Sequence, residues 1–240
     1  MKLLALVIAS SAIANAQLMF FEDGFQQIMQ PKRAMIADVT ATLTAHSPWG
    51  DITKVETGKY WRSSKGQILQ QDAHGHSLYV YLQEPRLHAE IDHELKLITA
   101  MKDIRERPRA GQDITRRIMS DTKPKKIGEA VLEGYRVTIR QGQWNGLTVE
   151  AWSSDEWKLP LLVKYATATT EFEQRYHNIQ RVEPEASVFE FPLGFRMHTT
   201  FMSTLPGAAG TPACMHMTDS VIGQPGERPY GRVFGTRESC

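Results

Sequence analysis

Alternating apolar and polar residues between Gly134 and Phe195 constrain the fold of this 240-residue chain more than any other feature. Side chains on a β-strand point to opposite faces in turn, so a strand with one buried face alternates with a period of two. The segments 135–140, 147–151 and 161–165 follow this period, and Asn145-Gly146 supplies a turn between two of them. The pattern predicts an antiparallel meander.

A second group of strands is predicted in the first half of the chain. From Met35 onward, Ala37, Val39, Ala41 and Leu43 alternate with aspartate and threonines, which is typical of a half-buried strand. Further strands are expected at residues 51–62, 66–71, 77–83, 88–92 and 95–101. Many short strands joined by tight turns form a twisted sheet that curls toward closure. The predicted fold class is therefore mainly β, of the α+β type, with a strongly curved antiparallel sheet in an open half-barrel.

The N-terminus has the features of a signal peptide. Lys2 precedes an apolar run, and small residues lead to Ala14-Asn15-Ala16, an A-x-A cleavage signature. The alternative is a membrane anchor, which needs roughly 20 apolar residues, whereas this run is interrupted at Ser10-Ser11. We predict that residues 1–16 are removed. No cysteine lies near the cleavage site for lipid attachment, so we expect a periplasmic or secreted chain without stable membrane insertion.

Three further segments complete the predicted organisation. Phe21, Phe25 and Ile28 recur at helical spacing before Pro31, which predicts a short N-terminal helix covering part of the sheet. Residues 102–126 lose the alternation and are net positive. They are interpreted as a solvated loop or, alternatively, an electrostatic contact. Residues 197–240 are rich in glycine and proline and predict an irregular, poorly ordered tail. The half-barrel domain would span residues 17–196.

Several motifs in this order resemble the periplasmic half-barrel superfamily of lipoprotein-sorting and sigma-factor-regulatory proteins (LolA/LolB/RseB-like). They are Tyr60-Trp61-Arg62-Ser63-Ser64-Lys65-Gly66, Glu150-Ala151-Trp152-Ser153-Ser154-Asp155, Tyr176-His177-Asn178-Ile179 and the run from Glu183 to Pro192. The resemblance spans roughly residues 20–196. It implies an exported, non-enzymatic binding protein whose concave sheet face holds a lipid, an acyl chain or a hydrophobic segment of a lipoprotein or other envelope protein. An envelope sensor or scaffold without a small ligand is the alternative.

Apolar positions on the predicted strands are the candidates for this hydrophobic groove, although they could equally be ordinary core. The candidates are Val39, Leu43, Val80, Leu82, Ile91, Val137, Ile139, Val149 and Val163. A curved sheet would gather such residues on one side, and barrel mouths are recurrent ligand sites.

The net charge and the sequence motifs make nucleic-acid binding, catalysis and metal handling less favoured than the binding function. Removal of Lys2 leaves 27 basic against 27 acidic residues, and a neutral chain argues against nucleic-acid binding. No G-x-S-x-G or phosphate-binding glycine motif is present, so no catalytic residue is assigned. Histidine and methionine residues leave a metal-handling protein as a weaker alternative, but we predict no metal and no cofactor. We expect a monomer.

The two cysteines, Cys214 and Cys240, both lie in the predicted tail. An exported chain reaches an oxidising compartment in which disulfides persist, so we predict that these residues pair. A reactive or metal-binding thiol is the alternative.

Overall fold

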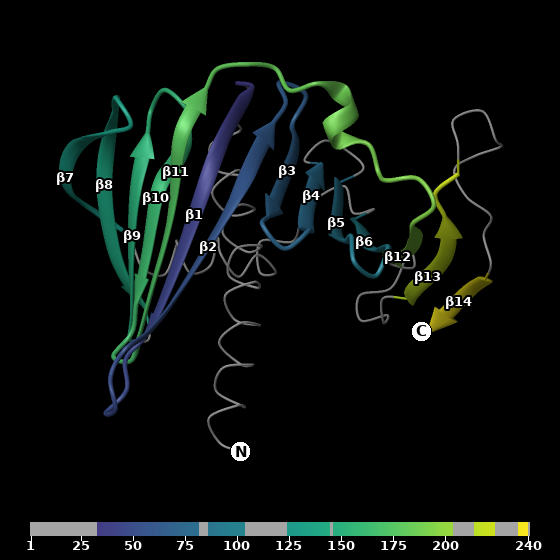
Figure 1. Ribbon diagram of the computed structural model, residues 1–240, viewed down its shortest axis with the longest axis horizontal. Helices are drawn as coiled ribbons and strands as arrows, with labels where there is room; N and C mark the ends of the chain where they lie inside the picture. The colour runs from purple at the N-terminus through teal and green to yellow at the C-terminus, as the bar shows by residue number, and fades with distance from the viewer. Residues whose placement is uncertain are drawn as a thin grey trace, which may run out of the picture. The chain divides into compact units, whose positions relative to one another are not determined.

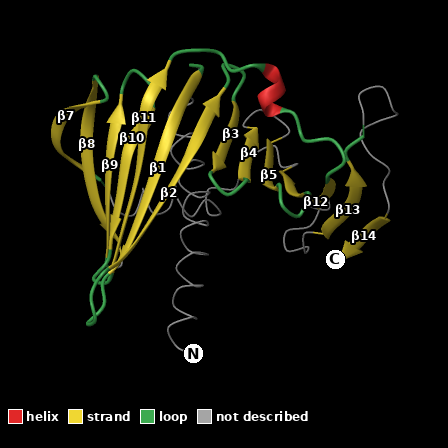
Figure 2. Ribbon diagram, viewed as in Figure 1, coloured by secondary structure: helices red, strands yellow, loops and turns green. Residues whose placement is uncertain are grey.

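The computed structural model describes residues 33–81, 86–103, 124–144, 146–203, 214–223 and 235–239. These residues are mainly β-strand, and the single helix among them is the short 3-10 helix η1 (Ala186–Phe189), drawn in red in Figure 2. The predicted signal peptide, the predicted N-terminal helix and most of the predicted basic loop lie outside the described residues. The mainly β character predicted from the alternation is confirmed.

Fourteen strands are described. They are β1 (Met35–Ala45), β2 (Ile52–Arg62), β3 (Gln67–Asp72), β4 (His76–Tyr81), β5 (Arg86–Asp92), β6 (Leu97–Asp103), β7 (Lys125–Leu132), β8 (Tyr135–Trp144), β9 (Leu147–Ser154), β10 (Leu159–Ala166), β11 (Thr170–Gln180), β12 (Arg196–Ser203), β13 (Cys214–Val221) and β14 (Gly235–Ser239). The hydrogen-bonded order is β14-β13-β12-β6-β5-β4-β3-β2-β1-β11-β10-β9-β8-β7. The sheet therefore has two edge strands, β14 and β7, and is not closed.

Two compact units make up the chain. Unit 1 contains residues 37–58 and the strands β7 to β11, which Figure 1 shows as neighbouring long strands. Unit 2 contains residues 59–107 and 181–240. Strand β2 contributes residues to both units.

Unit 1 is an antiparallel meander joined by tight turns. Glu133 and Gly134 both have positive φ, 52° and 81°, as a two-residue type I′ hairpin turn requires. Tyr165 is in register with Val149 on β9 and with Phe172 on β11. Residues paired in register lie on the same face, and these three form a buried cluster with Val163. Because Leu161 and Leu162 are also buried, β10 is covered on both faces.

The end of the chain differs from the prediction. Residues 197–240 were expected to be an irregular tail, but β12, β13 and β14 lie there. The clustered glycines and prolines fall largely in 204–213 and 224–234, between these strands and outside the described residues. Strand β12 pairs in parallel with β6, with Met197 opposite Ile98. The expectation of an entirely antiparallel sheet was therefore wrong, because a parallel pairing needs a long connection and leaves no turn signal in the sequence.

Candidate functional site

One face of β3 to β6 in unit 2 is apolar along most of its length. Leu69 is in register with Tyr79, and Tyr79 is in register with Ala89. Next to this row, Gln71, Ser77 and Ile91 are successively in register on the same three strands. Strand β6 continues the face with Ile98 and Ala100, opposite Ile91 and Ala89. A face of this kind must be covered to be stable in water.

The cover is residues 183–195, here called the strap, which include η1. The carboxylate of Glu183 accepts a hydrogen bond from the backbone N–H of Ser64, with N–O distances of 3.1 and 3.2 Å. At the other end, the N–H of Gly194 donates to the carbonyl of Ile222 at 2.9 Å. Gly194 has a φ of +78°, a conformation that glycine adopts without strain. These bonds hold both ends of the strap within unit 2.

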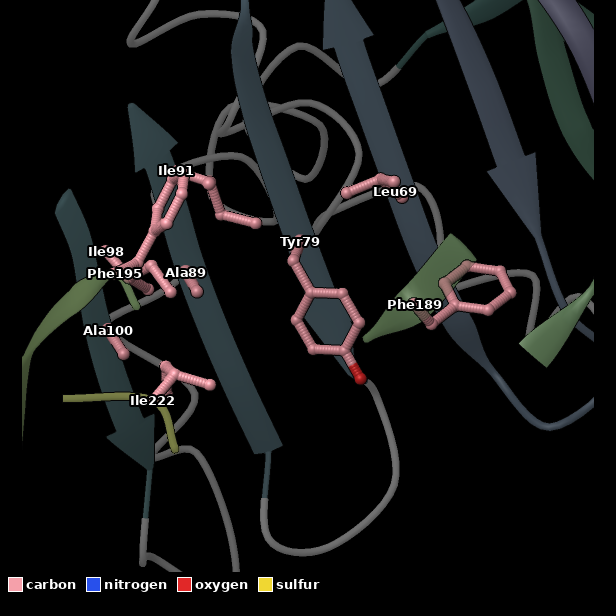
Figure 3. Close-up of a cluster of buried hydrophobic side chains, with 9 residues drawn as sticks. All are labelled: Leu69, Tyr79, Ala89, Ile91, Ile98, Ala100, Phe189, Phe195 and Ile222. Carbon is pink, nitrogen blue, oxygen red and sulfur yellow. The ribbon is translucent and has the colours of Figure 1, made fainter. Parts of the chain in front are cut away.

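Between these ends, the strap places aromatic side chains on the sheet face. Phe189 and Phe195 are buried in the same cluster as Leu69, Tyr79 and Ile91. In Figure 3, Tyr79 lies between Phe189 on one side and Ile91 on the other. The ring of Phe191 contacts that of Tyr79 nearly edge to face, with centroids 5.2 Å apart at an interplanar angle of 68°, a favourable aromatic geometry.

The strap does not fill the space above the sheet face. A cavity of about 270 Å³ remains, lined by Trp61, Leu69, Gln71, Ser77, Tyr79, Ile91, His93, Val188, Phe189, Glu190, Phe191 and Pro192. Most of these side chains are apolar or aromatic, as in small-molecule sites. The cavity is therefore our candidate functional site.

Four polar residues line the cavity beside the apolar ones. Ser77 Oγ lies 3.3 Å from His93 Nε2, and the His93 ring meets that of Phe195 edge to face at 5.5 Å and 74°. Gln71 and Glu190 complete the polar lining. A bound molecule would thus meet both an apolar wall and hydrogen-bonding groups.

The predicted groove residues do not lie together. Ile91 lines the cavity of unit 2, whereas Val149 and Val163 belong to the buried cluster of unit 1, against which Leu43 packs. Val39 is also buried in unit 1. These four residues of unit 1 remain candidates for a second apolar surface or for core.

Two other predicted groove residues, Val137 and Ile139, belong to β8 and lie on the opposite face of the sheet from Val149. Val137 is in register with Ser154, and Ile139 with Trp152, positions that alternate with Val149 along β9. Val80 belongs to β4, but its side chain is not among those described. Leu82 lies outside the described residues.

Sequence reasoning missed Trp61, Leu69 and the lining residues of the strap. The signal was nevertheless present, because Trp61 belongs to the first motif that carries the family resemblance. Val188, Phe189 and Phe191 belong to the last of those motifs. Alternation identifies sheet faces, but it does not show which later segment covers them.

Two other features, a metal site and a membrane-spanning helix, are not found within the described ranges. Among the described residues, no group of three or more histidine, cysteine, aspartate or glutamate side chains is placed so that it could hold a metal ion. None of the helical structure described is long and apolar enough to cross a bilayer.

Comparison with known proteins finds similarity in fold. The chain is similar to a protein in the solved Pseudomonas aeruginosa MucA/MucB complex, with 11% identity, a TM-score of 0.39 and coverage of 83% of this chain and 74% of that one. It is also similar to PNGF-II, with 10% identity, a TM-score of 0.41 and coverage of 70% of this chain and 32% of that one. A LolA superfamily protein from Nitrosomonas europaea matches with 9% identity, a TM-score of 0.33 and coverage of 72% and 96%.

No protein-family model matches the sequence. No curated protein matches it either.

Proposed function

We propose that this chain is an exported binding protein and that the cavity of unit 2 receives the apolar part of its ligand. The observation that carries this proposal is the cavity itself, about 270 Å³ in volume, between the apolar sheet face and the strap. The ligand would be a lipid, an acyl chain or a hydrophobic segment of another envelope protein. Periplasmic or secreted localisation is part of the proposal and rests on the A-x-A signature at Ala14-Asn15-Ala16.

The cavity volume limits what can enter. Pockets for drug-sized ligands usually span about 300–1,000 Å³, and this cavity lies just below that range. It can accept one compact apolar group, such as the end of an acyl chain or a single large side chain. A whole diacyl lipid would require the strap to move.

A binding role is proposed in preference to a catalytic one. Ser77 and His93 are the only pair in the described lining that suggests a nucleophile and a base, at 3.3 Å. Such a pair also needs a third group that orients the base, and among the described residues no carboxylate is hydrogen-bonded to His93. Ser77 and His93 are therefore interpreted as polar contacts for a ligand.

The alternative function is a protein-binding sensor or scaffold without a small ligand. In that case the cavity would receive a side chain of a partner protein, as one protein meets another in the solved MucA/MucB complex. The two functions differ in what accompanies the purified protein. Native mass spectrometry of protein isolated from the periplasm without detergent should show an excess mass that matches a lipid if the carrier function is correct.

The cavity can be tested separately with a neutral apolar dye, N-phenyl-1-naphthylamine, whose fluorescence rises in apolar surroundings. Gln71→Trp would fill the cavity, and Gln70→Trp is the matched control because alternation places Gln70 on the opposite face of β3. We expect wild type and Gln70→Trp to bind the dye and Gln71→Trp to bind at least about tenfold more weakly, since the added indole occupies the site. Equal binding by all three proteins would contradict the cavity as the site.

A further inference from the structure

The lining of the cavity in unit 2 combines aromatic rings with one acidic residue. Four of the described residues that line it carry aromatic rings, namely Trp61, Tyr79, Phe189 and Phe191, and Glu190 is the one acidic residue among those described. No lysine or arginine is among the described residues that line it. Its electrostatic character therefore favours a cation over an anion.

The aromatic rings that line the cavity come from different segments of unit 2. Tyr79 and Phe191 come from β4 and from the strap, with centroids 5.2 Å apart and planes at 68°. Trp61 comes from β2 and packs against the same cluster. The faces of aromatic rings carry negative potential and attract ammonium groups within about 6 Å of the ring centroid, tryptophan most strongly.

Glu190 directly follows η1, and its backbone N–H donates to the carbonyl of Ser187 at 3.2 Å. Among the described residues, no lysine or arginine forms an ion pair with its carboxylate. Glu190 lines the cavity and is exposed to solvent, so its negative charge can complement that of a bound cation. Aromatic rings together with an acidic side chain are the groups that recognise alkylated ammonium ions.

We propose that the cavity binds a quaternary ammonium group of the choline type. A primary ammonium would need acceptors for three N–H donors, whereas a trimethylammonium group needs no acceptor and presents methyl groups to the apolar wall. This inference rests on the proposed function, and it adds a cation covered by methyl groups to the compact apolar groups that the cavity can receive.

The test compares choline with 3,3-dimethyl-1-butanol, which has the same shape without the charge. Binding is followed in ¹H–¹⁵N spectra of the full chain through the indole N–H of Trp61, assigned with a Trp61→Phe variant. Choline should bind more tightly than the neutral alcohol by roughly two- to thirtyfold, the range that cation–π attraction supplies. Glu190→Gln should reduce the affinity for choline about three- to tenfold and leave that for the alcohol unchanged.

The matched control is Glu185→Gln, because Glu185 is an exposed carboxylate on the same strap that does not line the cavity. It should bind choline as wild type does. Equal affinity for choline and the alcohol, or unaltered choline binding by Glu190→Gln, would overturn the inference while leaving apolar binding intact. Failure of both compounds and of the neutral dye to bind would overturn the proposed function as well.

A further comparison distinguishes free choline from a lipid headgroup. Dihexanoyl phosphatidylcholine, used below its micellar concentration, carries the same cation on a phosphodiester with short acyl chains. If it binds more tightly than choline, the source is a lipid headgroup. If its phosphate weakens binding next to Glu190, the source is a free quaternary amine. Either result supports the cation site. If neither choline nor the phospholipid binds, the proposed cation site is wrong.

Discussion

Replacing Phe189 by alanine should lower the free energy of unfolding by about 3–4 kcal/mol. The ring is only 6% exposed and lies in the core cluster with Leu69 and Tyr79 (Figure 3). Burying a phenylalanine contributes about 1.5–3 kcal/mol by transfer alone, and loss of packing brings Phe→Ala substitutions to about 3–5 kcal/mol. We expect the lower part of that range because one side of the ring borders the cavity and has fewer contacts to lose.

Urea unfolding followed by circular dichroism measures this change. With a denaturant slope of about 2 kcal/mol/M, the midpoint should fall by roughly 1.5–2 M. Leu193→Ala is the control, because Leu193 lies on the same strap but is 55% exposed and should change the free energy by less than about 0.5 kcal/mol. If the two variants unfold at the same urea concentration, the strap does not hold unit 2 together and the reasoning is refuted.

Three further predictions concern other parts of the chain. Val149→Glu places a charge at a buried position of unit 1 and should unfold the protein in a thermal melt; a folded variant that no longer takes up the neutral dye would instead show that Val149 lines a groove. The hydrogen bond that His46 Nδ1 donates to the Asp51 carboxylate raises the pKa of His46 above its usual 6.5, so the contact stabilises the fold while His46 is protonated, and this stabilisation is lost as pH rises through the raised pKa; Asp51→Asn should lower that pKa in an NMR titration, and an unchanged value would contradict this cause. Cys214 and Cys240 should show no free thiol in protein taken from the periplasm until it is reduced, and two thiols before reduction would exclude the disulfide.

The prediction of a disulfide rests on the sequence and on the expected export of the chain to an oxidising compartment. Cys240 lies outside the described residues. The pairing of Cys214 with Cys240 therefore stays a prediction that thiol labelling must decide.

The strands with an apolar face could be predicted from the sequence, and those without one could not. Residues 37–43, 135–140 and 147–151 alternate clearly because one face of each strand is buried, and the structure places β1, β8 and β9 there. Strand β12 begins Arg196-Met197-His198 and has no such period. Its position depends on its ladders to β6 and β13, and backbone hydrogen bonds of that kind leave little trace in residue type.

The candidate site was harder to predict because it combines segments that are far apart in the sequence. Alternation placed Ile91 on a strand, and the structure shows that this residue lines the cavity. It could not show that Phe189, nearly a hundred positions later, would cover the same face. The motif that contains Phe189 was recognised as a family resemblance, but nothing in its pattern predicted which sheet face it covers.

The stability of the strap also limits the kind of ligand that the cavity can hold. A ligand that fits beside Phe189 keeps the burial of that ring, worth about 3–4 kcal/mol by the estimate above. A ligand that displaces Phe189 must first replace that free energy, which corresponds to a loss of roughly 200- to 1,000-fold in affinity. Small ligand ends are therefore favoured over whole lipids as long as the strap stays in place. Phe189→Ala, which removes this penalty, should consequently bind large apolar ligands more tightly than wild type even though it is less stable.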